Sequence, residues 1–268
     1  MQEAWVRWNR TDVDGLENPQ AWLTTVVSRL GIDRLRARRR QQTTYVGPWL
    51  PEPFVAVGDD PAAAAEMSDS LTTAFLVLLE RLSPNERLVL LLADVFQQPF
   101  PTVAAVIGKS EDATRQMAVR ARRKVRAEQD LRPSAASPSR SDQLAVANEF
   151  VEAIMLGDEA RVRSLLSDDA VLVSDGGAMR HAARRPVIGP ERVTRFLLNI
   201  TRRFLTLHGH TVGVEQRWIN GAPGVIISID GSPYWVASLD VCDGRVDRFF
   251  ATLNPDKLAS VDRFVDLV

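Results

Sequence analysis

The chain has 268 residues, 45% hydrophobic and 25% charged, which excludes a collagen-like or wholly disordered protein. Its single cysteine excludes a disulfide framework and a cysteine-based zinc finger and favours a cytoplasmic protein; no metal site or cofactor is expected. No run approaches the roughly 20 apolar residues of a membrane span, and the N-terminus does not have the pattern of a signal peptide.

The net charge of −1 is the sum of strongly segregated blocks. Six arginines and one acid lie within 29–40, and seven bases and two acids within 109–126. Six acids and no base lie within 48–80. Two basic blocks on either side of an acidic joint favour two nucleic-acid contacts, although solvated basic helix faces give the same pattern.

Helices are predicted over 2–8 and 20–40, the second from apolar residues at a period near 3.6. Prolines and glycines predict an extended linker over 47–60, and an apolar helix is expected over 62–82. Ser83, Pro84 and Glu86 form a helix-start signal, with serine as N-cap and glutamate at the third position, for a helix reaching about Phe96.

A helix-turn-helix is predicted next. A short helix over 101–107 ends at Gly108, and Ser110 is the expected N-cap of a basic helix over 111–128. We expect this second helix to pack through Ala113, Met117 and Ala121. Thr114, Arg115, Gln116, Arg120 and Arg123 then face outward, where its N-terminal part can enter a major groove. An ordinary helical hairpin with a basic face is the alternative.

Residues 129–141, rich in Pro, Ser and Ala, predict a flexible linker and a domain boundary. Beyond them, helices over 142–156 and 159–166, a strand over 170–174 and a helix over 190–203 precede strands at 211–219, 225–230, 234–241 and 245–252. The pairs Asn220-Gly221, Asp230-Gly231 and Asp243-Gly244 predict hairpin turns. The result is an α+β domain of charge −3 (14 bases, 17 acids over 142–268), which is not expected to bind nucleic acid.

Several motifs resemble one family. Residues 2–8, 19–23 and 33–36 resemble region two of extracytoplasmic-function (ECF) sigma factors, and 83–126 resemble their region four. Trp49-Leu50-Pro51-Glu52-Pro53 and Asn254-Pro255-Asp256-Lys257-Leu258 match two signatures of a subgroup with a SnoaL-like C-terminal extension, the sigma factor J type. Asp175-Gly176-Gly177 begins a third signature, from which the chain departs at 178–180.

The resemblance implies a multidomain fold: all-α region two, helix-turn-helix region four and an α+β SnoaL-like cone. The implied boundaries are 1–47 for a partial region two, in which the chain begins, 48–68 for a linker, 69–130 for region four, 131–141 for a flexible linker and 142–268 for the regulatory domain. It implies no enzyme but a factor that binds core RNA polymerase, at the beta-prime clamp and beta flap, and directs initiation at promoters.

The resemblance also implies site residues. Contacts with the minus-thirty-five element are expected from Ser110, Thr114, Arg115, Gln116, Arg120, Arg123 and Lys124. Phosphate contacts on the minus-ten side are expected from Arg29, Arg36, Arg38, Arg39 and Arg40. Trp5, Trp8 and Trp22 either stack on extruded bases or belong to the core.

Regulation in cis is implied for the extension, which would dock on the linker through the motif segments. The interdomain regulatory residues are Trp49, Leu50, Pro51, Glu52, Pro53, Asp175, Gly176, Gly177, Arg180, Asn254, Pro255, Asp256, Lys257 and Leu258. Two alternatives concern the cone: a small-molecule sensor, or an isomerase- or cyclase-like enzyme with a buried carboxylate base. The candidates for that chemistry are Asp175, Asp240, Asp247, His181, His208 and His210.

Overall fold

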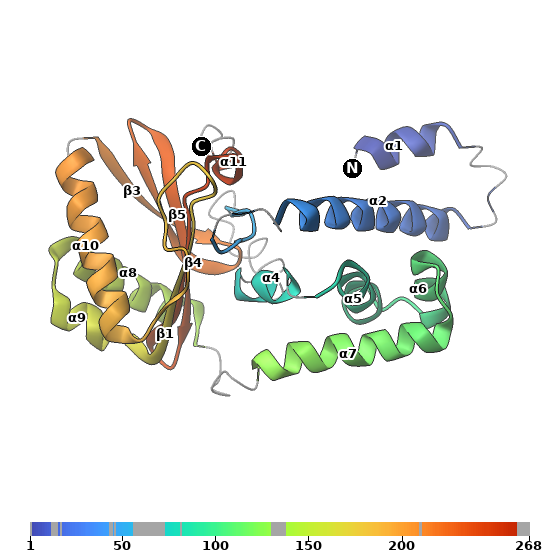
Figure 1. The fold of residues 1–268 in the computed structure, drawn as a ribbon, viewed down its shortest axis with the longest axis horizontal. Coiled ribbons are helices and arrows are strands. Elements are labelled where there is room, and N and C mark those ends of the chain that lie inside the picture. Colours follow the sequence, from blue (N-terminus) through green and yellow to red (C-terminus); the bar gives the residue numbers. More distant parts are fainter. Residues whose placement is uncertain are drawn as a thin grey trace. The chain divides into compact units, whose positions relative to one another are not determined.

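The computed structural model describes residues 2–11, 16, 18–42, 45, 47–55, 73–80, 82–129, 138–208 and 211–261 (Figure 1). The chain divides into two compact units, each discontinuous in sequence. The helical unit comprises Met1–Thr44 and Leu78–Arg132, and the C-terminal unit comprises Tyr45–Val77 and Pro133–Val268. The linker residues that are described thus pack with the C-terminal domain. No helix in the described ranges is long and apolar enough to cross a bilayer.

The predicted helices of the first half are present wherever the chain is described. They are α1 (Gln2–Asn9), α2 (Pro19–Gln42), α4 (Thr73–Glu80), α5 (Pro84–Leu90), the π-helical turn η1 (Leu91–Val95), α6 (Phe100–Ile107) and α7 (Glu111–Gln129). The remainder of the helix expected over 62–82, up to residue 72, lies outside the described residues. Helix α4 begins in the C-terminal unit and ends in the helical unit.

The predicted caps position the helix-turn-helix. The Ser83 side chain accepts from the Glu86 N–H while the Glu86 carboxylate accepts from the Ser83 N–H, so the capping box is confirmed. Gly108 ends α6 in the left-handed region at φ +67°, a conformation that glycine adopts without steric cost. The Ser110 hydroxyl then accepts from the Ala113 N–H at 3.3 Å and caps α7.

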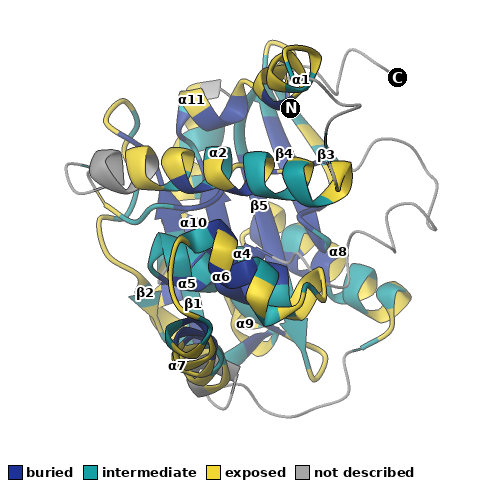
Figure 2. Ribbon diagram, turned by 90° about the vertical axis from the view of Figure 1, so that its right-hand side faces the viewer, coloured by how far each residue is buried: buried dark blue, intermediate teal, exposed yellow. Residues whose placement is uncertain are grey.

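Among its described residues, the helical unit has an apolar core to which α2, α5, η1, α6 and α7 contribute. Its buried members are Ile32, Leu88, Val89, Leu92, Val103, Val106, Met117 and Ala118. Helix α2 carries mainly exposed and half-buried residues (Figure 2). Trp8 and Trp22 pack edge to face with centroids 5.7 Å apart, which favours the core interpretation of this pair. Trp5 is 65% exposed.

The C-terminal unit has the predicted α+β fold. Its elements are α8 (Arg140–Leu156), α9 (Glu159–Ser164), β1 (Leu166–Asp175), β2 (Val187–Ile188), α10 (Pro190–His208), β3 (Val212–Ile219), β4 (Ala222–Ile229), β5 (Ser232–Cys242), β6 (Arg245–Thr252) and α11 (Pro255–Leu258). The sheet order is β2-β1-β6-β5-β4-β3. The meander β3–β6 is antiparallel, whereas β1 runs parallel to β6. The sequence did not indicate β2, α11 or the parallel pairing.

The three predicted hairpin turns are confirmed: Asn220, Asp230 and Asp243 lie at φ +48°, +50° and +49°, each before a glycine of positive φ. One face of the sheet packs against α8, α9 and α10 around residues such as Phe150 and Phe249. Linker residues and the first part of α4, residues 73–77, contact the other face. There, Leu50 and Val77 pack with Phe250, and Val55 packs with Ile226, Val236 and Leu258.

Candidate regulatory site and nucleic-acid interface

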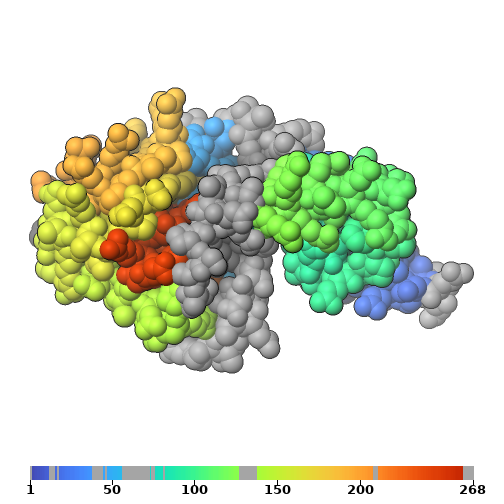
Figure 3. Space-filling view, turned by 90° about the horizontal axis from the view of Figure 1, so that it is seen from below, coloured from blue at the N-terminus to red at the C-terminus, as the bar shows by residue number. Residues whose placement is uncertain are grey.

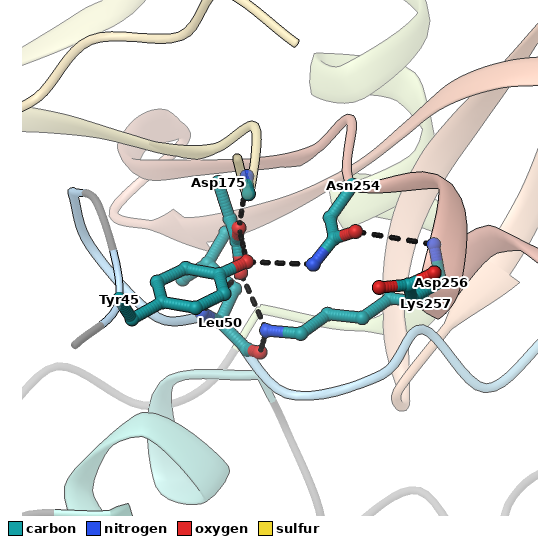
Figure 4. Close-up of polar contacts among 7 residues, drawn as sticks. Tyr45, Leu50, Asp175, Asn254, Asp256 and Lys257 are labelled. Atoms are coloured by element: carbon teal, nitrogen blue, oxygen red, sulfur yellow. Dashed lines mark hydrogen bonds and ion pairs between the residues drawn. The ribbon is translucent and has the colours of Figure 1, made fainter. Parts of the chain in front are cut away.

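The Asp175 carboxylate, fully buried at the end of β1, is surrounded by hydrogen-bond donors from three parts of the C-terminal unit (Figure 4). One oxygen accepts from the Tyr45 hydroxyl and from the Gly177 N–H at 3.1 Å. The other accepts from the Leu50 N–H at 2.8 Å and from the Lys257 ammonium at 2.5 Å. Leu50 belongs to the linker and Tyr45 lies just before it, so the carboxylate binds this segment of the chain to the domain.

Lys257 completes this arrangement from α11. Its side chain is 4% exposed, and its ammonium also donates to the Leu50 carbonyl. The nitrogen lies 3.6 Å from the centroid of the Trp49 ring and 5.2 Å from that of Tyr45. The two rings pack edge to face, 4.5 Å apart. A cation within about 6 Å of a ring face is attracted by the ring quadrupole. We call Tyr45, Trp49, Leu50, Asp175, Asn254 and Lys257 the Asp175 cluster.

Local hydrogen bonds and close approaches explain why asparagine stands at 254 and glycine at 176 and 177 in two of the motif segments. Asn254 caps α11 by accepting from the Asp256 N–H at 3.1 Å, while its amide donates to the Tyr45 hydroxyl at 2.6 Å. Helix α11 turns Lys257 inward. A Cβ atom on Gly177 would lie 2.8 Å from Asn254, and one on Gly176 would lie 2.2 Å from the Arg180 carbonyl oxygen. Glycine at 177 therefore allows the β1 turn to approach the cap of α11, and glycine at 176 allows the loop to fold back on Arg180.

Other residues of the three motifs lie elsewhere. Arg180 donates to the Tyr234 carbonyl at 2.7 Å and stacks on the Tyr234 ring, on β5. Leu258 packs with Val55 in the apolar cluster on the linker face of the sheet. Pro51 and Pro53 are buried, whereas Glu52 and Asp256 have exposed side chains.

Tyr45 is the residue of the cluster that sequence reasoning missed. Burial raises the pKa of its phenol above the ordinary value, and the hydrogen bond to Asp175 raises it further. The hydroxyl therefore stays protonated and donates to the carboxylate. The available signal was weak: Tyr45 is one of two tyrosines in the chain and lies four residues before Trp49, in a segment without helical periodicity.

The candidate nucleic-acid surface lies on α7, which forms much of the visible face of the helical unit in Figure 3. Gln116, Arg120 and Arg123 are exposed. Exposed Arg115 pairs with Glu111 and lies 4.7 Å from the centroid of the Phe100 ring. Ser110 is exposed at the cap.

The outward orientation predicted for Thr114 was wrong. Its side chain is fully buried and its hydroxyl donates to the Ser110 carbonyl at 2.9 Å, because the helix packs through Thr114, Met117, Ala118 and Ala121. Lys124 is half exposed and donates to both oxygens of Glu86, at 2.8 and 2.9 Å. Burial acts to raise the pKa of Glu86, but the bonds from Lys124 and Ser83 outweigh it and hold this pKa below its ordinary value.

On α2, Arg29 and Arg36 are exposed, and Arg36 lies 3.7 Å from Asp33. The side chains of Arg38, Arg39 and Arg40 lie outside the described part of the structure. The same holds for His208 and for residue His210. Among the described residues, no group of three or more His, Cys, Asp or Glu side chains could hold a metal ion.

Residues 72–125 match the family model "Sigma-70, region 4", which covers the helix-turn-helix and its two preceding helices. The match identifies this part of the chain as a sigma-70 region 4 module.

The wider comparisons extend over nearly the whole chain. It is 38% identical to the ECF RNA polymerase sigma factor SigJ of Mycobacterium tuberculosis (strain ATCC 25618 / H37Rv), over 96% of this chain and 83% of that protein. It is 29% identical to the probable ECF RNA polymerase sigma factor SigI of the same species (strain CDC 1551 / Oshkosh), over 96% and 84% of the two chains. The crystal structure of M. tuberculosis SigJ superposes with a TM-score of 0.73, at 36% identity, over 96% and 87%. The chain belongs to the ECF RNA polymerase sigma factors.

Its function is therefore to direct transcription initiation, as a factor that binds core RNA polymerase and promoter DNA. A sigma factor is not an enzyme, so the isomerase or cyclase interpretation is set aside. The candidate base of that interpretation, Asp175, is engaged by Lys257 and by linker donors. Asp247 accepts from Ser167 at 2.9 Å, and His181 is exposed.

Proposed function

We propose that the C-terminal domain regulates this ECF sigma factor in cis by holding the linker between the two promoter-binding regions. The observation that carries the proposal is the fully buried Asp175 carboxylate, which accepts from the Leu50 N–H of the linker and from the hydroxyl of Tyr45, just before the linker. A tethered domain acts at high effective concentration, so modest contacts suffice for docking. Docking then restricts the positions that the two flanking DNA-binding regions can adopt.

On the promoter, we infer that Arg115, Gln116 and Arg120 contact the minus-thirty-five element from the N-terminal half of α7. Their exposure on that helix supports this assignment. We assign phosphate contacts to Ser110, Arg123 and Lys124, with Lys124 exchanging Glu86 for a phosphate. On the minus-ten side, the basic end of α2, from Arg29 to Arg40, supplies phosphate contacts.

Contacts with the beta-prime clamp and the beta flap stay predictions, as does a small-molecule ligand of the C-terminal domain. So do the domain boundaries drawn from the sequence.

Transcription in vitro with core polymerase tests regulation in cis. Asp175→Asn removes the charge that attracts Lys257 but preserves the shape of the side chain. The matched control is Asp247→Asn, which changes a half-buried carboxylate of β6 that bonds Ser167. We expect Asp175→Asn to change promoter-specific initiation severalfold and Asp247→Asn to leave it unchanged. Equal activity of the two variants and the wild type contradicts regulation through the linker.

A second measurement tests docking itself. A protease site introduced at residues 133–136 allows the purified chain to be cut between α7 and α8. If linker contacts hold the C-terminal domain, the two fragments elute together in size-exclusion chromatography. The Asp175→Asn variant is expected to separate into two species after cutting. Complete separation of the cut wild-type fragments would contradict docking.

A further inference from the structure

A second polar site on the linker face of the sheet is formed around Asn220, the first residue of the β3–β4 turn. Asn220 is 6% exposed, Thr73 of α4 is 3% exposed and Ser238 of β5 is 3% exposed. The Asn220 amide nitrogen donates to the Thr73 hydroxyl at 3.1 Å, and this hydroxyl also bonds the Ser238 hydroxyl at 2.8 Å. None of these residues belongs to the three signature motifs.

The same Asn220 residue also contacts the linker at Phe54. Its amide oxygen accepts from the Phe54 N–H at 2.9 Å, and its backbone N–H donates to the Phe54 carbonyl at 2.8 Å. Val55 forms an isolated antiparallel bridge with Ile219, the preceding residue. One side chain thus contacts the chain at Phe54 and again at Thr73, where α4 begins.

Thr73 lies at the start of region four, because the family match opens at residue 72. Apolar contacts reinforce the position of this turn: Val77, one turn further along α4, packs against Leu50 and Phe250. A hydroxyl that loses its hydrogen-bond partner costs more free energy when it is buried than when it is exposed. The contacts of Thr73 with Asn220 and Ser238 therefore favour one position of the start of α4.

We propose that Asn220 is a positioning residue through which the C-terminal domain holds the first helix of region four, in addition to the linker. The occupant of this docking site is residues 73–77 of the chain itself. The inference deepens the proposed regulation and rests on it for its effect on transcription. It predicts a contact that the Asp175 cluster does not supply: release of the linker at Leu50 leaves Thr73 bound to Asn220 and Ser238.

The three hairpin turns offer a matched experiment. Asn220 and Asp243 have nearly the same backbone conformation, φ +48° and +49°, and each precedes a glycine. Asn220→Gly and Asp243→Gly therefore make the same backbone change in two turns, and glycine tolerates both. Only Asn220→Gly removes an amide that bonds Phe54 and Thr73. Asp243 is exposed at the β5–β6 turn.

Hydrogen–deuterium exchange of the full chain, read on peptides covering 73–80, is the measurement. We expect Asn220→Gly to accelerate exchange there roughly tenfold, the size expected for loss of one or two neutral hydrogen bonds. Thr73→Val is expected to act similarly, and Thr73→Ser, which keeps the hydroxyl, to remain close to wild type. Wild-type exchange at 73–80 in Asn220→Gly, or equal acceleration in Asp243→Gly, overturns the proposal.

Transcription separates the two proposals. With both correct, Asn220→Gly and Asp175→Asn each change initiation, and Asp243→Gly does not. In one outcome, Asp175→Asn changes initiation, but Asn220→Gly behaves like Asp243→Gly in both amide exchange and transcription. The Asn220 inference then fails, and regulation through the linker stands. If exchange at 73–80 responds to Asn220→Gly but neither Asn220→Gly nor Asp175→Asn alters initiation, the contact is supported and regulation in cis fails.

Discussion

Replacing Lys257 with methionine is expected to release the linker from the C-terminal domain. The change removes an ammonium that is 4% exposed and leaves the Asp175 carboxylate buried without a countercharge. Breaking one partner of a buried ion pair costs about 3–5 kcal/mol. The lower end applies here, because Asp175 keeps donors from Tyr45, Leu50 and Gly177. About 3 kcal/mol corresponds to an opening equilibrium roughly a hundredfold larger, at 1.4 kcal/mol per factor of ten.

Amide exchange of residues 45–55 in the intact chain measures this opening. The matched control is Arg180→Met, which also removes a cation stacked on an aromatic ring, at 3.8 Å from the Tyr234 centroid, but away from the linker. The double variant Asp175→Asn/Lys257→Met leaves no unpaired charge, so its exchange is expected to lie between wild type and Lys257→Met. If Lys257→Met exchanges no faster than Arg180→Met, the buried ion pair does not hold the linker.

Three further predictions concern separate parts of the chain. Trp49→Ala is expected to accelerate amide exchange at 45–55 by about tenfold or more, because it removes the ring that contacts Lys257 and Tyr45. Exchange at the wild-type rate would show that these ring contacts are dispensable. Arg120→Ala and Arg123→Ala are each expected to reduce the slope of log K against log salt concentration for promoter-DNA binding by about 0.9, the value for one phosphate contact. Fluorescence anisotropy measures the binding, and the control is Arg163→Ala, at an exposed position of α9. An unchanged slope refutes the contact. The folded-state pKa of Glu86 is depressed below 4.5, so its contribution to stability is present above that pH and is lost as the pH falls through the folded pKa. The free energy of unfolding of Glu86→Gln, measured in urea, should therefore fall less steeply at acid pH than that of the wild type. Parallel pH profiles count against this.

The parts of the fold that the sequence predicted are those set by local chemistry. The capping box of Ser83 and Glu86 depends on residues within one helical turn, and Asn-Gly and Asp-Gly pairs favour the positive φ angles of a tight hairpin turn. Thr114 shows the limit. A helical period fits a buried face made of residues 113, 117 and 121, and it fits equally one made of 114, 117, 118 and 121. Only the packing of the neighbouring helices decides between the two faces.

The site was predictable only in part, for a related reason. The resemblance singled out Asp175 and Lys257, but Tyr45, Thr73 and Asn220 lack a local pattern that marks them. Tyr45 contacts a carboxylate 130 positions away, and Thr73 contacts an amide 147 positions away. Asn220 was assigned to a turn, and its conformation agrees with that assignment. Its second role, binding Phe54 and Thr73, depends on which segment of the chain crosses the sheet beside it. No residue near Asn220 in the sequence specifies that segment.

The discontinuous C-terminal unit has a consequence for biosynthesis. The segment 45–77 leaves the ribosome before any of the strands against which Leu50, Val55 and Val77 pack. At about 5–20 residues per second, the sheet that receives it is completed roughly ten seconds or more afterwards. During that interval a nascent chain has the helix-turn-helix but no partner for its linker. Under the proposed regulation in cis, folding of the C-terminal domain ends the interval in which the linker has no partner, and translation arrest before β6 is expected to yield a factor without that regulation.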